Sequence, residues 1–325
     1  IKWFVGSNEP NYAGSAGSKN FYNTYEKWQK GVLQVRKALD DLKLNWIGIV
    51  GGDTTGFAGT QEYLTNIAKN IPTEVGDYGC HLYLSNYLVD KGELYSQTKQ
   101  LYDEIKAIDP GLGVYRQADV WEAGLLDGKN GATDCQALID TTDYAVRMAD
   151  YTIQCLAAGI NGIVYWDFDD AMHFMYVNNT QTAKEWGMFS TLAGASASKQ
   201  ELRPWFHSSS LLNHLFKKGN KVYSPLQNDP SVDEYFRSLA TINQDGTQGG
   251  FIAVNAGVKK ATKTFYMEDT VLGEKLYVYR FYDGAIRLGE DGFIIPNEII
   301  NGSLNKKITM EIPANALVVV SNERL

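Results

Sequence analysis

The sequence predicts a parallel α/β domain followed by a smaller antiparallel β domain. Up to about residue 218, short apolar runs typical of buried strands alternate with stretches whose apolar residues recur three and four positions apart, as on one face of a helix. From residue 219, β-rich runs are separated by turn signals such as Gln244-Asp245-Gly246. We therefore predict domains at residues 1–218 and 219–325.

The first region contains five strand-like runs alternating with helical stretches, which is the pattern of a parallel sheet. The expected strands are residues 1–6, 44–50, 77–83, 111–124 and 160–167, and the expected helices are residues 25–42, 60–70, 94–108 and 138–156. Gly159 lies where the last of these helices needs a C-cap residue. A further helix is expected at residues 204–217, between the two domains.

The second region shows shorter runs with alternating polarity, as in strands that bury one face. The expected strands are residues 250–255, 262–267, 275–281, 307–312 and 316–321. Their spacing and the turns between them predict an antiparallel sandwich.

Composition excludes several classes of partner. The net charge is -8 and no basic patch is visible, which argues against nucleic acid or an anionic membrane. No run of about 18 apolar residues predicts a membrane span. The 3 cysteines are an odd number and lack metal-site spacing, so we expect no disulfide scaffold and no metal site. The many aromatic residues suit a neutral sugar ligand, although core packing accounts for most of them.

Two glutamates follow strand-like runs at matching places. Glu9 comes after the run that ends at Gly6, and Pro10 behind it cannot continue a strand ladder. Glu122 lies near the end of the fourth run. Strand ends carry the chemistry in parallel barrels, and retaining glycoside hydrolysis needs two carboxyl groups roughly 5–5.5 Å apart. A single glutamate at a strand end is usually solvated or salt-bridged, so the pair is the informative observation.

These residues resemble clan A, the retaining glycoside hydrolases with a (β/α)8 barrel, Asn-Glu after the fourth strand and Glu after the seventh. Asn8-Glu9-Pro10 is similar to the acid/base motif, and Glu122 falls at the nucleophile position. Many of these enzymes append a small sandwich, so the resemblance covers the whole chain. It implies a TIM-type barrel, with only strands four to eight present in this chain, followed by a small all-β sandwich.

The resemblance assigns roles to the first site residues. Glu9 would act as general acid and then as general base, while Glu122 would attack the anomeric carbon as the nucleophile. Asn8 would hydrogen-bond the 2-hydroxyl of the sugar; the alternative is a turn residue that caps the next segment.

Further residues would bind the substrate. His81 and Tyr83 look like the clan's His-x-Tyr pair, in which Tyr83 orients the nucleophile and His81 lines the cleft. Trp166 would form the floor under the sugar. Asp53 follows the second expected strand and would contact a hydroxyl group or be a turn carboxylate. Trp121 would point away from Glu122 in a regular strand, which favours a packing role.

The chain differs from the clan at its N-terminal end. The first three βα units of the clan's barrel, on the order of 90 residues, have no equivalent in this sequence. A five-strand arc would leave two unpaired edges, so we expect the barrel to be completed by a missing N-terminal segment or by another chain. We also expect a secreted or extracellular protein.

The sequence thus predicts a retaining glycoside hydrolase that acts on a β-linked glycan without a cofactor. Two alternatives stay open. One is a non-catalytic carbohydrate-binding homologue, and the other is a transglycosylase in which a sugar replaces water in the second step.

Overall fold

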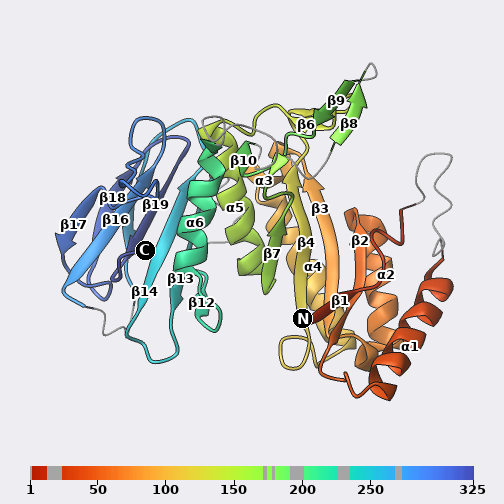
Figure 1. Cartoon of the computed structure of the whole chain (residues 1–325). Coiled ribbons are helices and arrows are strands. Elements are labelled where there is room, and N and C mark those ends of the chain that lie inside the picture. Colours follow the sequence, from red (N-terminus) through yellow and green to blue (C-terminus); the bar gives the residue numbers. More distant parts are fainter. Residues whose placement is uncertain are drawn as a thin grey trace. The chain divides into compact units, whose positions relative to one another are not determined.

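A computed structural model describes residues 2–12, 24–170, 174–177, 180–190, 201–225, 235–267 and 273–325 (Figure 1). The chain forms two compact units, each described by itself. The first comprises Ile1–Tyr83, Ser96–Gly124 and Ala158–Trp166, and the second comprises Leu84–Tyr95, Leu125–Ala157 and Asp167–Leu325. The expected domain boundary at residue 219 stays a prediction. None of the described helices is long and apolar enough to cross a membrane.

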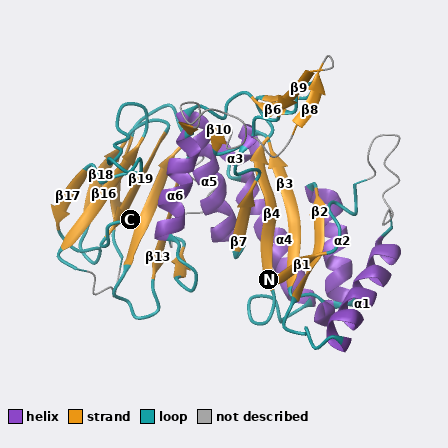
Figure 2. Cartoon of the chain, viewed as in Figure 1, coloured by secondary structure: helices purple, strands orange, loops and turns teal. Residues whose placement is uncertain are grey.

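The first unit is built on a five-stranded sheet with the order β1-β2-β3-β4-β7. Its strands are β1 (Trp3–Val5), β2 (Gly48–Thr55), β3 (Asp77–Leu84), β4 (Gln117–Leu125) and β7 (Gly162–Tyr165). The pairs β1–β2, β2–β3 and β4–β7 are parallel, as the alternation of strands and helices predicted. Its helices are α1 (Tyr25–Asp41), α2 (Phe57–Asn70), the short η1 (Pro72–Glu74) and α4 (Glu93–Ile108), which begins in the second unit (Figure 2).

Helix α1 illustrates why these segments form helices. The hydroxyl of Thr24 caps its first turn by accepting a hydrogen bond from the backbone N–H of Lys27. Trp28 and Val32, four residues apart, are buried on one face. The ring of Trp28 meets that of Tyr63 in α2 edge to face, with 5.3 Å between the ring centroids. The apolar face therefore holds α1 against α2.

Strand β2 differs from its prediction in a way that matters for the site. It runs to Thr55 instead of ending at residue 50. Its pairing with β3 shifts between Gly52 and Thr54, and Asp53 has φ 54° at that bulge. Asp53, which was expected to follow the strand, thus lies at a bulge inside it, and a bulge redirects the side chain that it carries.

Two carboxyl groups are buried near the amino-terminal ends of β3 and β4. Asp77 accepts a hydrogen bond from the indole of Trp121, and Asp119 accepts one from the amide of Gln117. Neither Oδ1 atom accepts a hydrogen bond from the residues that the structure describes. Burial and the charge of Asp119 raise the pKa of Asp77, and burial raises that of Asp119 to about 6.

Trp121 therefore donates a hydrogen bond to Asp77, a polar contact that the expected packing role did not include. The register of β4 against β7 shifts between Val120 and Ala123, so the regular alternation of side chains does not hold at Trp121 and Glu122.

Asp119→Asn should stabilise the protein above pH 6. The raised pKa means that the folded state holds a proton that the unfolded state releases near pH 3.9, so stability falls as pH rises through about 6. An amide avoids this loss, and we expect a gain of about 1–2 kcal/mol at pH 8 in urea unfolding. Asp103→Asn, on the exposed face of α4, is the control. Lower stability of Asp119→Asn at pH 8 would show that the carboxylate is needed there.

The second unit contains α3 (Asn86–Asp90), most of α5 (Thr142–Ala158) and α6 (Pro204–Leu215), with antiparallel sheets. Its larger sheet has the order β12-β13-β14-β19-β16-β17, and β15 pairs with β18. These strands are β12 (Lys221–Tyr223), β13 (Phe236–Ile242), β14 (Gly249–Asn255), β15 (Ala261–Phe265), β16 (Lys275–Phe281), β17 (Glu298–Asn301), β18 (Ile308–Ile312) and β19 (Ala316–Ser321). Three further pairs of short antiparallel strands belong to this unit: β5 (Lys129–Asn130) with β6 (Cys135–Gln136), β8 (Phe174–Val177) with β9 (Thr180–Ala183), and β10 (Phe189–Ser190) with β11 (Glu201–Leu202).

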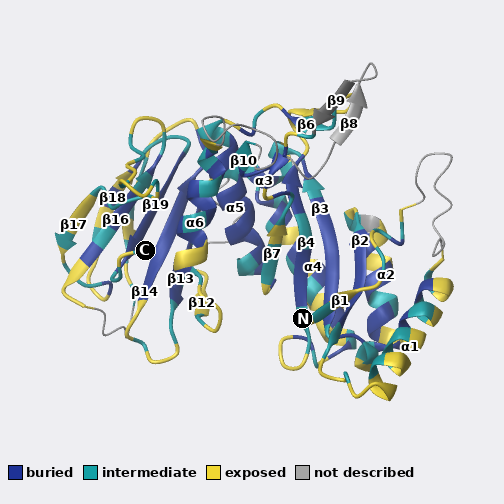
Figure 3. Cartoon of the chain, in the orientation of Figure 1, coloured by how far each residue is buried: buried dark blue, intermediate teal, exposed yellow. Residues whose placement is uncertain are grey.

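The core of the antiparallel sheets follows the alternation seen in the sequence. Phe251, Leu276, Met310 and Val318 belong to one buried cluster, drawn from β14, β16, β18 and β19. Strands β14 and β19 are buried along their whole length (Figure 3). All five strands expected in this region are present within two residues of their predicted bounds, whereas β12, β13 and β17 were not predicted.

Candidate active site

Five polar side chains gather at the carboxyl ends of the strands in the first unit. Glu9 follows β1, Asp53 lies in the last part of β2, His81 and Tyr83 lie near the end of β3, and Glu122 lies in β4. Parallel strands present these ends at one edge of the sheet, which is where barrel enzymes keep their reactive groups. The structure thus brings together five of the seven residues expected at the site.

The loop that carries Glu9 is held against the end of β2. Glu9 has φ 45°, and its backbone N–H donates to the carbonyl of Asp53 at 2.9 Å. The side chain of Asn11 bonds both the carbonyl and the N–H of Thr55, at 2.8 and 2.9 Å. The strained backbone at Glu9 is therefore supported from both sides. The sequence contained no sign of the role of Asn11, which reads as an ordinary loop residue.

His81 lies between three carboxyl groups and is only 1% exposed. Its Nδ1 is 3.1 Å from Oε1 of Glu9 and 3.4 Å from Oε2 of Glu122, and its Nε2 is 2.9 Å from Oδ1 of Asp53. Burial acts to lower the pKa of His81, but the hydrogen bonds to Asp53 and Glu9 and the nearby charges outweigh it and raise the pKa to about 9. At neutral pH His81 is an imidazolium that donates to Glu9 and Asp53.

Glu122 is held by Tyr83, whose hydroxyl donates to Oε2 at 2.7 Å. Burial raises the pKa of Glu122, while the charge of His81 and the bond from Tyr83 oppose that rise. The side chains of Glu9 and Glu122 are 24% and 19% exposed, so solvent reaches both.

One side-chain atom each of Glu9, His81 and Glu122 lies within 4.8 Å of the other two. This separation suits a metal ion, and the hydrogen bonds that the imidazole makes with Glu9 and Asp53 equally suit proton chemistry.

Trp166 and Asn8 lie beside this cluster. Trp166 directly follows β7, and its backbone N–H donates to the carbonyl of Ala123 in β4 at 3.0 Å. Its partly buried side chain thus lies just beyond the carboxyl end of β7, the strand next to that of Glu122. Asn8 is exposed, and its side chain makes no hydrogen bond with the residues that the structure describes.

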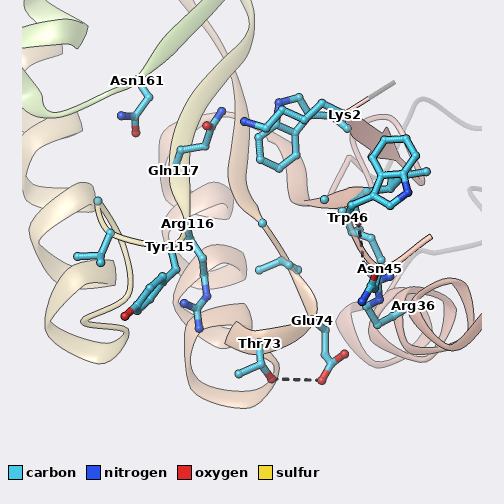
Figure 4. Close-up of a pocket in the computed structure, with 18 residues that line it drawn as sticks. Lys2, Arg36, Asn45, Trp46, Thr73, Glu74, Tyr115, Arg116, Gln117 and Asn161 are labelled. Carbon is cyan, nitrogen blue, oxygen red and sulfur yellow. Dashed lines mark hydrogen bonds between the residues drawn. The ribbon is translucent and has the colours of Figure 1, made fainter. Parts of the chain in front are cut away.

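A hollow of about 510 Å³ lies at the other ends of the same strands (Figure 4). Its lining includes residues at or just before the starts of β1, β2, β3, β4 and β7, among them Lys2, Gly48, Gly76, Gln117 and Asn161. Among the described residues that line the hollow, Glu74 is the only carboxylate, so these residues offer no carboxylate pair.

No protein-family model matches the sequence, and no curated protein matches it. Several solved structures are similar to this chain. The family 30 subfamily 8 xylanase Xyn30A from Clostridium acetobutylicum is 14% identical, with a TM-score of 0.62 over 99% of this chain and 66% of that one. A conserved exported protein from Bacteroides fragilis is 13% identical, with a TM-score of 0.65 over 99% and 65%. The family 51 α-L-arabinofuranosidase AbfB from Bifidobacterium longum is 12% identical, with a TM-score of 0.63 over 98% and 66%.

At such identities the likeness establishes the fold alone. This chain spans just under two thirds of the length of each of these three proteins. The five parallel strands and their helices correspond to part of the TIM barrel of glycoside hydrolases, and antiparallel sheets accompany them, as the sequence led us to expect.

Proposed function

We propose that this chain carries the catalytic site of a retaining glycoside hydrolase, with Glu9 as acid/base and Glu122 as nucleophile. The observation that supports this most is the short separation of the two glutamates, whose nearest side-chain atoms lie within 4.8 Å. Retaining enzymes place the two carboxyl groups roughly 5–5.5 Å apart, whereas inverting enzymes need about 6.5–9.5 Å to admit a water molecule.

In the first step, the carboxylate of Glu122 attacks the anomeric carbon. The bond between that carbon and the glycosidic oxygen breaks, and Glu9 donates its proton to the departing oxygen. Tyr83 orients the attacking carboxylate through its 2.7 Å hydrogen bond. The product is a glycosyl ester on Glu122 and a free sugar hydroxyl.

In the second step, the carboxylate of Glu9 takes a proton from a water molecule, whose oxygen attacks the anomeric carbon and releases Glu122. Two inversions leave the anomeric configuration unchanged. Asn8 would bond the 2-hydroxyl, and Trp166 would lie under the sugar. No step requires a cofactor or a metal.

The substrate class is a β-linked, neutral glycan, in keeping with a net charge of -8 and no basic patch. Similar structures are named as a xylanase and an arabinofuranosidase, so the individual sugar stays open. One similar structure is named as an exported protein, which supports a secreted location.

We further propose that another segment completes the barrel. Among the described strands, β1 pairs only with β2 and β7 only with β4, which leaves two sheet edges without a partner. Unpaired edges of this kind promote aggregation unless something covers them. A segment from a longer polypeptide, or from another chain, would supply the remaining strands.

A fluorinated, activated aryl glycoside tests the proposal. It should trap the glycosyl ester, and peptide mapping by mass spectrometry should find the label on Glu122. A label on another residue would refute the assignment. Binding of glycan without turnover across a panel of aryl glycosides and polysaccharides would point to a carbohydrate-binding homologue, and sugar-to-sugar transfer products would point to a transglycosylase.

Tyr83→Phe should lower kcat by about 10- to 100-fold, since a hydrogen bond to a charged group contributes about 1.5–3 kcal/mol. The change removes the bond to Glu122 and keeps the ring. Steady-state kinetics on an aryl glycoside measures it. Tyr115→Phe, an 85% exposed tyrosine at the other end of the sheet, should keep the wild-type kcat. Equal rates for wild type and Tyr83→Phe would mean that Tyr83 does not orient the nucleophile.

A further inference from the structure

Asp53 is linked to Glu9, the proposed acid/base residue, once directly and once through His81. Its backbone carbonyl accepts the N–H of Glu9 at 2.9 Å, and its carboxylate faces Nε2 of His81 at 2.9 Å. The other nitrogen of His81 faces Glu9 at 3.1 Å. Asp53 therefore holds Glu9 directly through the backbone and indirectly through the imidazole.

The local fold places Asp53 for this contact. It lies at the bulge of β2 with φ 54°, a conformation that costs a residue other than glycine about 1–3 kcal/mol. Its side chain is redirected there toward β3, and the residue is only 3% exposed. A carboxylate so buried has little access to a substrate hydroxyl group, and its nearest polar partner is His81.

Asp53 differs from the other carboxylates around His81 in its part in the proposed reaction. Among the residues that the structure describes, the ionisable groups that face the imidazole are Glu9 after β1, Asp53 in β2 and Glu122 in β4; Tyr83 lies on the same strand as His81. Glu9 and Glu122 must each change charge during the proposed reaction, whereas Asp53 takes no part in it. Asp53 is thus the one of these three residues that the proposed reaction leaves chemically unchanged.

We propose that Asp53 is a positioning residue that keeps His81 protonated and oriented between Glu9 and Glu122. This role rests on the proposed function. With Nε2–H directed at Asp53, Nδ1–H points toward Glu9 and lies 3.4 Å from Glu122. The cation then favours the ionised Glu122 that attacks, and it remains beside Glu9 when that carboxylate takes a proton from water.

The substitution Asp53→Asn removes the charge of the side chain but keeps its size and shape, so it tests the effect of the charge alone. Asparagine tolerates a positive φ and can still accept the Nε2–H of His81, but it carries no charge. NMR titration of the imidazole follows His81 directly, and His81→Gln identifies its signal among the 4 histidines. We expect the pKa of His81 to be about 9 in the wild type and to fall by about 1–3 units in Asp53→Asn.

Asp109→Asn is the matched control. Asp109 is also a buried aspartate of the first unit, and it accepts a hydrogen bond from Tyr78 at 2.7 Å. Its replacement removes a buried charge without touching His81, so the titration of His81 should not change. An identical pKa of His81 in Asp53→Asn and wild type would overturn the proposal.

Two measurements keep the proposal open to refutation if Asp53→Asn fails to fold or the protein shows no turnover. A wild-type His81 that titrates near its ordinary pKa of about 6.5 overturns it without any variant. The wild type should also be stabilised below pH 6.5 and lose that contribution as pH rises through about 9, because the folded state binds the proton more tightly. Lack of turnover with the expected titration would refute the proposed function without refuting the effect of Asp53 on the protonation of His81.

Discussion

Glu122→Gln should lower kcat by ~10⁴-fold or more, because an amide cannot form the glycosyl ester and removal of an enzyme nucleophile costs rates of this order. The change keeps the size of the side chain and its ability to accept the hydrogen bond from Tyr83. Binding of the sugar should therefore persist. Steady-state kinetics on an aryl glycoside and calorimetry with an unreactive oligosaccharide measure the two quantities.

Glu74→Gln provides the matched control for this prediction. It makes the same substitution in the same unit, but in the hollow at the amino-terminal ends of the strands. Its kcat should equal that of the wild type. A Glu122→Gln variant with an unaffected rate would end the assignment of Glu122 as nucleophile, and a loss of both binding and rate would point to a disrupted fold.

Arg237→Met should lower the free energy of unfolding by about 3–5 kcal/mol, the usual cost of removing one partner of a buried ion pair. Arg237 in β13 donates to Oδ2 of Asp150 in α5 at 2.6 Å and to the carbonyl of Asp90 at 2.7 Å. Both charged residues are almost fully buried. Methionine fills similar space but leaves Asp150 without its cation. Urea unfolding at pH 7.5 measures the change.

The loss should grow with pH. Burial raises the pKa of Asp150 to about 6, although the charge of Arg237 opposes that rise. Asp150 therefore contributes stability below its unfolded pKa of about 3.9 that is lost as pH rises through about 6. Without Arg237 its folded pKa rises further, so the deficit of Arg237→Met should be small near pH 4 and largest above pH 7.

Lys260→Met serves as the control for the buried pair. Lys260 bonds Glu311 at 2.7 Å on the surface of the antiparallel sheets, where the two side chains are 69% and 52% exposed. Solvent screens such a pair, so its loss should cost less than ~1 kcal/mol. A deficit for Arg237→Met that is equal at pH 4 and pH 7.5 would assign its effect to packing and not to charge.

Local patterns were sufficient to predict most elements. The apolar spacing of α1 and α4 gave bounds within one residue of those observed, because a helix depends on periodicity within a few turns. The short edge strands β12 and β17 escaped prediction, since each has four residues or fewer and its pairing partner lies far away in the sequence.

The sequence by itself predicted that Glu9 and Glu122 lie near the carboxyl ends of parallel strands, because strand ends and the proline after Glu9 are local features. Only the tertiary structure decided that Asp53 turns inward to His81. That contact depends on a bulge in β2, where Asp53 is an extra residue without a partner position in β3, and such a bulge is visible only when the two strands are paired. It also depends on burial beside His81, a residue distant in sequence. Pairing across strands sets the direction and the electrostatic environment of a side chain, and a linear pattern contains neither.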